Sequence, residues 1–455
     1  MTDRVPFLRH PLALAGAVIT TASAAAFIAL LIAMFAGLFD NPYSGLVVFI
    51  AVPAVFVLGL VLIPIGARLE RKRTERDPGA ARDWPVLDFR QASVRRTTLV
   101  IVALTCVNIG IVLVAGYGGL HAMDSPKFCG QACHTPMHPQ FTAWQQAPHA
   151  RVACVSCHIG EGARGFIHAK LGGVRQLVEV ATGSYSRPIP SGAKMLPGAQ
   201  AQLCQNCHDP RRMSSGDRIR VIREYADDEA NTETMTVLQM HLSPSTSSPR
   251  AIHWHADPAV RIEYVATDDE RQTIPYVKVT RADGTVKEFR AAEATDAQVS
   301  GGPRQTMECM DCHNTIGHPI GQTPERAVDE AIAAGRLSRT LPFVRQEGVK
   351  VLKASYPSQD EAVQAIDRDL RKALASHQGD PAAIAGAVTA VQDLYRHNVF
   401  PAMKVTWGQY RDNKGHVTSN GCFRCHDDSH KAKDGSAISG DCDYCHTQIE
   451  RPSTD

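Results

Sequence analysis

The sequence has almost no net charge. Its 455 residues include 48 basic and 46 acidic side chains, which leaves a formal charge of only +2 at pH 7. The one strong basic cluster lies between residues 68 and 96. Proteins that bind nucleic acid rely on an excess of positive charge to neutralise phosphates, so nucleic acid is not an expected partner of this chain.

Cysteines outside one repeated motif are also nearly absent. Twelve of the thirteen cysteines fall into pairs that are followed directly by histidine. Only Cys106 is left over, in an apolar run where a small buried hydrophobic side chain is the expected role. This distribution argues against a disulfide framework, and zinc sites do not require a histidine beside every cysteine pair.

The cysteine pairs match the attachment motif of c-type haem. Two sulfurs at this spacing form thioethers with the two vinyl groups of one haem, while the adjacent histidine binds its iron as the proximal ligand. The sequence therefore predicts six covalently bound haems. The motifs comprise Cys129, Cys133 and His134, which have one extra residue between the thiols, then Cys154, Cys157 and His158; Cys204, Cys207 and His208; Cys309, Cys312 and His313; Cys422, Cys425 and His426; and Cys442, Cys445 and His446.

Further histidines are numerous enough to supply the second axial ligand of every haem. Of the 19 histidines, six are proximal and His10 precedes the first apolar run, which leaves twelve. This supply favours six-coordinate haems that carry electrons over haems kept open for a substrate. The predicted distal ligands, chosen for their positions beside the motifs, are His149, His255, His318, His416 and His430. His253 competes with His255, and Met137 is a candidate for the first haem, with packing against the porphyrin as its alternative role.

Three long stretches without a charged side chain occupy the first third of the chain. They run from Pro11 to Phe39, from Tyr43 to Ala67 and from Thr97 to Leu120. Each exceeds the roughly 20 residues that a helix needs to cross the hydrocarbon core. We therefore expect three transmembrane helices, with an uncleaved signal anchor first, because the apolar run continues well beyond the small residues near Ala24.

The distribution of basic residues predicts the orientation in the membrane. Arg4 and Arg9 precede the first span and the basic loop 68–96 follows the second, whereas residues 40–44 between these spans have no basic side chain. The positive-inside rule places the N-terminus and the loop in the cytoplasm. Covalent haem attachment independently indicates the periplasmic side for the remaining residues, so we expect a multi-pass protein of the bacterial inner membrane.

The expected fold is a mainly α multihaem cytochrome c with a small inserted β module. Residues 1–120 form the anchor, 121–210 a three-haem domain, 211–305 the β module and 306–455 a helical domain with three further haems. Alternation predicts strands at Arg261–Ala266, Tyr276–Arg281 and Val286–Arg290. Residues 282–284 supply a hairpin turn. Apolar residues at helical spacing predict helices over 324–397.

Several runs resemble the NapC/NirT/NrfH family of membrane-anchored multihaem quinol dehydrogenases. Residues 128–158, with Met137 three positions after His134, are similar to the first half of the family's haem domain. Other runs resemble a larger subgroup with extra C-terminal haems, which includes inner-membrane cytochromes of metal-reducing bacteria. These runs are Lys170 to Gln176, Arg187 to Pro190, Ile252 to His255, Phe400 to Trp407 and Gly421 to Gly435. The three-span anchor departs from the family's usual single helix.

The resemblance implies oxidation of menaquinol or another quinol at the outer membrane surface and electron delivery to periplasmic cytochromes or reductases. It also implies that Met137, rather than His134, is an axial ligand of the first haem. Lys170 matches the family's lysine beside the quinol ring, and Gln176 falls where the family has an acidic residue. His168 or Glu179 would then accept the proton that Gln176 cannot.

Two other functions stay open at this point. A terminal reductase would need at least one haem with an open iron position, and none of the six motifs shows the ligand change that usually accompanies it. An electron relay would lack its own quinone site and receive electrons from a partner subunit. The sequence also leaves open whether the chain forms a homo-oligomer or belongs to a larger complex.

Overall fold

The computed structural model describes residues 10–35, 47–76, 89–92, 94–96, 99, 110, 113–114, 116–119, 121–132, 135–159, 162–191, 200–208, 216–242 and 251–449. The chain divides into two units, Met1–Thr135 and Pro136–Asp455. Cys133 and His134 of the first motif lie outside the described residues.

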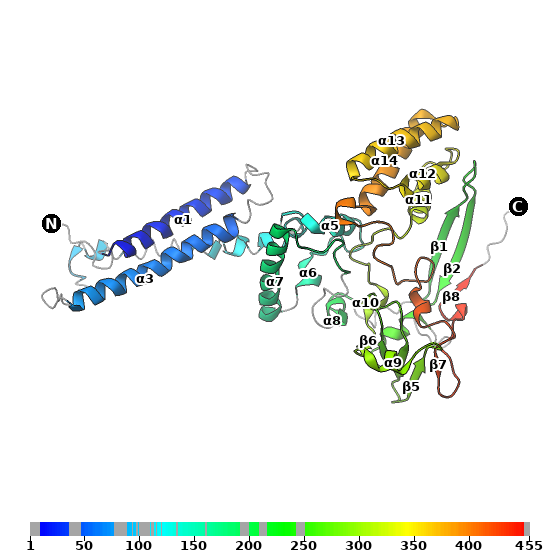
Figure 1. Ribbon diagram of the computed structural model, residues 1–455, viewed down its shortest axis with the longest axis horizontal. Coiled ribbons are helices and arrows are strands. Elements are labelled where there is room, and N and C mark those ends of the chain that lie inside the picture. Colours follow the sequence, from blue (N-terminus) through cyan, green and yellow to red (C-terminus); the bar gives the residue numbers. More distant parts are fainter. Residues whose placement is uncertain are drawn as a thin grey trace. The chain divides into compact units, whose positions relative to one another are not determined.

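Two long apolar helices pack side by side in the first unit. They are α1 (Pro11–Phe35) and α3 (Val52–Arg76), and each is long and apolar enough to cross a membrane (Figure 1). Glycines allow their backbones to approach closely: a Cβ atom added to Gly16 would lie 2.8 Å from the carbonyl oxygen of Gly59. Small residues at helix crossings permit this kind of close packing within lipid.

The anchor differs from the prediction in its boundaries and in its helix count. The described residues contain two helices long enough to span a membrane, where the sequence predicts three. The third predicted span, 97–120, falls mostly outside the described residues. α3 begins and ends later than the second predicted span, because the π-helical turn η2 (Val47–Ala51) precedes it and its last turns continue into the basic segment.

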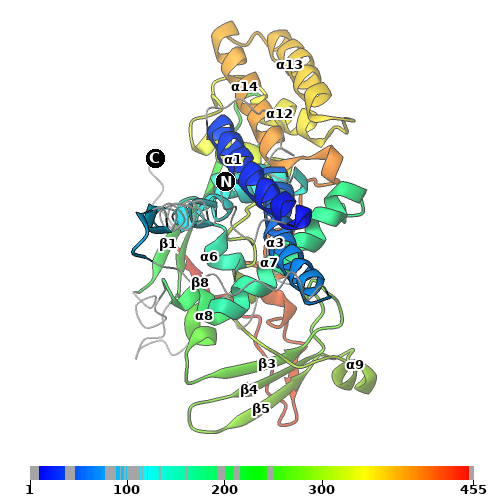
Figure 2. The ribbon, with the colours of Figure 1, turned by 90° about the vertical axis from the view of Figure 1, so that its left-hand side faces the viewer.

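The second unit contains two small antiparallel sheets (Figures 1 and 2). One has the order β1-β2-β8 and the other the order β6-β3-β4-β5-β7. The predicted strands are confirmed at β3, β4 and β5, and Gly284, at φ +79°, occupies the predicted hairpin turn. The strands are β1 (Arg218–Tyr225), β2 (Glu233–Met240), β3 (Arg261–Val265), β4 (Tyr276–Thr280), β5 (Val286–Arg290), β6 (Gln305–Thr306), β7 (Lys431–Ala432) and β8 (His446–Gln448).

Both sheets join segments that are far apart in the sequence. β8 pairs with β2, and β7 pairs with β5, so each sheet includes a strand from the last residues of the chain. The strands within residues 211–305 pair with one another as β1-β2 and β3-β4-β5, and a strand from the last residues of the chain extends each sheet. The division of the chain into four segments remains a prediction.

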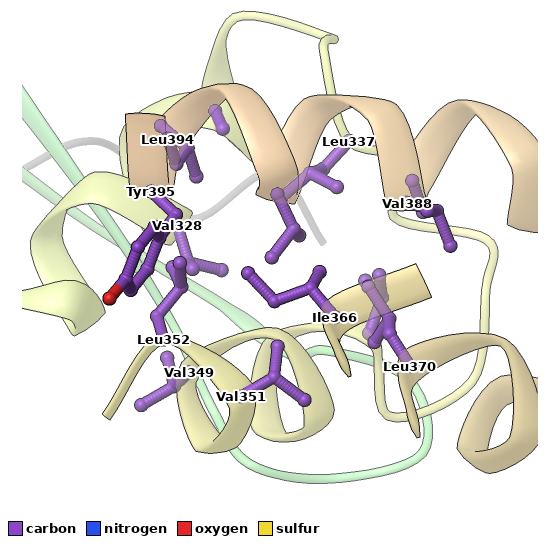
Figure 3. Close-up of a cluster of buried hydrophobic side chains, with 14 of the residues drawn as sticks. Val328, Leu337, Val349, Val351, Leu352, Ile366, Leu370, Val388, Leu394 and Tyr395 are labelled. Atoms are coloured by element: carbon purple, nitrogen blue, oxygen red, sulfur yellow. The ribbon is translucent and has the colours of Figure 1, made fainter. Parts of the chain in front are cut away.

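Four helices form a module with its own apolar core. They are α11 (Pro324–Ala333), α12 (Val344–Lys353), α13 (Gln359–Ser376) and α14 (Pro381–Asn398), which confirms the helical prediction for this part. The side chains of Thr323, Ser358 and Asp380 cap three of their N-termini, which satisfies backbone N–H groups that would otherwise lack partners. Ile366, with Val328 and Leu370, is fully buried between these helices (Figure 3).

The remaining helices include one of 21 residues and several short ones that coincide with the cysteine motifs. In the first unit η4 (Phe128–Ala132) carries Cys129. The others are η5 (Thr135–Met137), α5 (His138–Gln145), α6 (Val155–His158), α7 (Gly162–Thr182), α8 (Gln200–Gln205), η7 (Ile252–Ala256), α9 (Asp296–Gly301), α10 (Cys309–Cys312), η8 (Pro401–Met403), η9 (Gly421–Arg424) and η10 (Cys442–Tyr444).

The helical module offers a direct test of its core. Ile366→Ala should lower the free energy of unfolding by about 2 to 5 kcal/mol, because it removes three methyl or methylene groups from a site without exposure to water. Ile219→Ala makes the same change on β1, where the side chain is 59% exposed, and should change stability by less than about 0.5 kcal/mol. Denaturant unfolding followed by far-UV circular dichroism measures both; equal losses would contradict the described core.

Candidate haem-binding sites

The fully described motifs share one local backbone arrangement. In four of them the histidine N–H donates to the carbonyl oxygen of the first cysteine, which closes a single helical turn. These hydrogen bonds join His158 to Cys154 at 3.0 Å, His208 to Cys204 at 2.8 Å, His313 to Cys309 at 2.8 Å and His426 to Cys422 at 3.1 Å. Residues three apart in a helical turn lie on one face, so both cysteine side chains can reach the same group. In the last motif the turn is closed by Cys445, and His446 begins β8.

Each of these five motif histidines faces a second histidine from another segment. The ring centroids lie between 5.8 and 6.4 Å apart. Two imidazole nitrogens that are each about 2 Å from one metal atom lie about 4 Å apart, which places the ring centroids about 6 Å apart. The spacing therefore fits one iron atom between each pair. The pairs are His149 with His208, His158 with His318, His253 with His313, His255 with His426, and His416 with His446.

Hydrogen bonds orient several of these rings. Nδ1 of His318 donates to the carbonyl oxygen of Gln140 at 2.8 Å, and Nδ1 of His255 donates to the carbonyl oxygen of Ile252 at 2.7 Å. A proton held at Nδ1 leaves Nε2 as the nitrogen with a free lone pair, the usual arrangement of a metal-binding histidine. Burial lowers the pKa of both imidazoles and so favours the neutral form that binds metal.

The short helix η7 supplies histidines to two different pairs. His253 faces His313, whereas His255 faces His426, so the two residues that compete in the sequence each have a partner in the structure. Nδ1 of His253 is buried and has no hydrogen-bond partner among the described atoms. An orphaned nitrogen in a buried ring beside another imidazole agrees with a site made for a metal-bound group.

His430 lies differently from the prediction. Its side chain is buried, Nδ1 lies 2.8 Å from a carboxylate oxygen of Asp427, and Nε2 donates to the carbonyl oxygen of Ile274 at 2.7 Å. Both ring nitrogens are therefore engaged, and neither is available to iron in this arrangement. His430 fixes the loop after the motif 422–426, and the geometry does not support its predicted role as a ligand.

Successive motifs lie next to one another in the second unit. The helices α8 and α10 pack together, and the thiols of Cys204 and Cys309 lie within hydrogen-bonding distance. The two residues between the thiols of the motif 422–426 contact neighbouring sites: one contacts the preceding motif, and the other contacts a histidine of the next imidazole pair. Arg424 donates to the carbonyl oxygen of Asp311 at 2.7 Å, and the ring of Phe423 stacks on His416 at 4.4 Å between centroids.

All four residues predicted for quinol chemistry lie on α7. His168 is exposed, and the Glu179 carboxylate accepts a hydrogen bond from Nε of Arg175 at 2.8 Å. Gln176 is half-buried, and the backbone of Lys170 belongs to the same helix. A stripe of exposed apolar side chains also recurs at helical spacing along α7. The sequence prediction did not use this stripe, although its spacing is visible in the sequence. The stripe comprises Ile167 (57% exposed), Leu171 (68%), Val174 (59%) and Val178 (57%).

Met137 is half-buried in η5. Cys133 and His134 of the first motif lie outside the described residues. The first site therefore has no observed pair to compare with the other five. The choice between His134 and Met137 as its axial ligand remains a prediction.

Two comparisons with known proteins show the family of the chain. Residues 92–242 match the model of the NapC/NirT cytochrome c family, N-terminal region. Over 97% of its length, and 88% of the relative's, the chain is 39% identical to the cytochrome c-type protein ImcH of Geobacter sulfurreducens. The chain belongs to the NapC/NirT cytochrome c family. The matched region includes the first three motifs, and membership in this family implies that the chain carries c-type haem. No solved structure matches the chain.

The different environments of His255 and His430 lead to opposite expectations. His255→Ala should convert one low-spin haem to a high-spin form, because it removes one of two facing imidazoles. His430→Gln should leave all spin states unchanged and lower the free energy of unfolding by about 1 to 3 kcal/mol, because buried hydrogen-bond partners are left unsatisfied. Electron paramagnetic resonance of the oxidised proteins distinguishes them; a high-spin signal in His430→Gln alone would reverse the two assignments.

Proposed function

We propose that the chain is an inner-membrane quinol dehydrogenase that passes electrons from the quinol pool through six c-type haems to periplasmic acceptors. The observation that carries this proposal is the set of five facing imidazole pairs, each at the spacing of a doubly coordinated iron. Membership in the NapC/NirT family supports the same function.

In this proposal each motif holds one haem, and its second axial ligand comes from another segment. The two thioether cysteines and the two axial histidines of each haem would be Cys154, Cys157, His158 and His318; Cys204, Cys207, His208 and His149; Cys309, Cys312, His313 and His253; Cys422, Cys425, His426 and His255; and Cys442, Cys445, His446 and His416. Cys129 and Cys133 would hold the remaining haem, with His134 or Met137 at its iron.

Two imidazoles at each of five sites favour electron transfer over substrate reduction. Haem iron with two strong axial ligands takes up and releases single electrons, and it has no position left for a substrate. A terminal reductase would need one site with a single facing ligand. Among the fully described motifs each histidine has a facing partner, which supports a conductor rather than a reductase.

We place the quinol site on α7. A quinol is lipophilic, and the exposed stripe around Leu171 offers an apolar surface on the helix that also carries Lys170. Oxidation of a quinol releases two electrons and two protons, so the site needs a proton acceptor. His168 is exposed to water and can accept a proton, whereas Glu179 is already paired with Arg175 and Gln176 has no basic group. Lys170 would orient the quinol oxygen.

The anchor and the basic loop support a location in the bacterial inner membrane with the haem-binding unit in the periplasm. α1 and α3 would contact lipid, and the expected acceptors are periplasmic cytochromes or reductases.

The quinol site is tested by anaerobic mixing of the purified protein with a reduced menaquinol analogue. Haem reduction, followed by visible absorption, should slow at least about tenfold in Lys170→Ala, because one charged hydrogen bond to the quinol is lost. Lys372→Ala removes an exposed lysine from α13 and should have no effect. Dithionite should reduce all variants equally. Absence of reduction in the intact protein would favour the relay, and a normal rate in Lys170→Ala would exclude this site.

The number of haems is measured independently of activity. The mass of the intact mature chain should exceed that of the polypeptide by six haem groups, and the pyridine haemochrome assay should give the same ratio. Cys133→Ala should still receive haem at the other five motifs and should lose the haem at the motif 129–134. A ratio of five in both the wild-type protein and Cys133→Ala would show that the motif with the extra residue does not hold haem.

A further inference from the structure

A buried charged cluster lies where two successive motifs meet. Asp311 is one of the two residues between the thiols of the motif 309–313, and Arg424 is the equivalent residue of the motif 422–426. Both side chains are buried. Besides its bond to Asp311, Arg424 donates to the carbonyl oxygens of Arg271 at 3.0 Å and Gly421 at 2.8 Å. The cluster therefore belongs to both haem-attachment segments.

The Asp311 carboxylate receives three hydrogen bonds. The hydroxyl of Tyr264 donates to Oδ1 at 2.5 Å, Nη1 of Arg271 donates to the same oxygen at 2.6 Å, and the N–H of Glu308 donates to Oδ2 at 2.7 Å. The carboxylate side chain is 1% exposed and that of Arg271 is 24% exposed. Burial and the adjacent negative charge raise the pKa of Tyr264, so its hydroxyl remains a donor.

The loop that presents Arg271 holds it in an unfavourable backbone conformation. Arg271 has φ +57°, in the left-handed region that non-glycine residues seldom adopt. The Asp268 carboxylate stabilises this loop by accepting the backbone N–H groups of Gln272 at 3.0 Å and Thr273 at 2.7 Å. A residue held in this region by its surroundings points to a function for its side chain.

We propose that the Asp311–Arg271 pair sets the reduction potential of the haem attached at the motif 309–313. This inference rests on the proposal that this motif carries a haem. An oxidised haem site has one more positive charge than the reduced site, so a buried anion nearby favours iron(III) and a buried cation favours iron(II). In the native protein the two charges offset each other at 2.6 Å. Removing the carboxylate leaves the guanidinium groups of Arg271 and Arg424 without it, and removing the Arg271 guanidinium leaves the carboxylate with Arg424 alone.

The proposal predicts shifts of opposite sign for two single variants. Asp311→Asn removes the carboxylate from the cluster and should raise the potential of one haem, whereas Arg271→Gln removes one of its two guanidinium groups and should lower it. Each shift should correspond to about a tenfold change in the ratio of reduced to oxidised haem, or about 59 mV for one electron. Arg271→Lys keeps the charge and should restore a potential near the native one. Potentiometric titration followed by electron paramagnetic resonance measures the individual haems.

An exposed pair of the same kind provides the control. Arg290 and Asp296 also lie 2.6 Å apart, but their side chains are 45% and 94% exposed, so water screens both charges. Arg290→Gln and Asp296→Asn should leave every potential unchanged. Shifts of the same sign in Asp311→Asn and Arg271→Gln, or shifts no larger than in the controls, would overturn the proposal.

The haem content separates failure of this inference from failure of the proposed function. If the wild-type protein lacks haem at the motif 309–313, the pyridine haemochrome ratio falls short and the proposed function is contradicted. A full ratio with unshifted potentials contradicts only the role of the pair. Should Arg271→Gln fail to receive haem, Asp311→Asn still decides, because the Arg271 guanidinium is 24% exposed and can remain hydrated without the carboxylate.

Discussion

Facing pairs of imidazoles link distant segments of the second unit outside its helical module. The paired histidines come from segments that are far apart in the sequence, such as His158 before α7 and His318 after α10. Outside the helical module the apolar clusters are small, and the motifs occupy single helical turns. A metal bound by two such side chains links their segments and couples ligand binding to folding. We infer that haem attachment completes this part of the fold.

The helical module contributes rigidity to the same arrangement. Its apolar core is continuous and independent of any motif. The end of α14 fixes the segment that carries His318, because Oδ1 of Asn398 accepts the N–H of Gly321 at 2.6 Å. Trp407 adds a hydrogen bond from its ring nitrogen to the carbonyl oxygen of Leu352 at 3.2 Å. A haem-free module thus determines where one facing imidazole lies.

Contacts between neighbouring motifs give the proposed electron path its order. The residues between paired thiols are free to vary for haem attachment, yet Phe423 and Arg424 use these positions to contact a histidine of the next pair and a residue of the preceding motif. Asp311 uses the equivalent position to bring a charge into the interior. Spacing and electrostatics of successive sites are therefore encoded within the attachment motifs themselves.

The sequence by itself determined the features that depend on local pattern: the Cys-and-His motifs, the helices over 324–397 and the strands β3 to β5. Tertiary structure decided which distal histidine faces which motif. His430 lies four residues after His426, yet its nitrogens bind Asp427 and Ile274, whereas His253 and His255 face motifs well beyond them in the sequence. Ligand pairing depends on where distant segments meet in space, and residue spacing along one segment carries no information about that meeting.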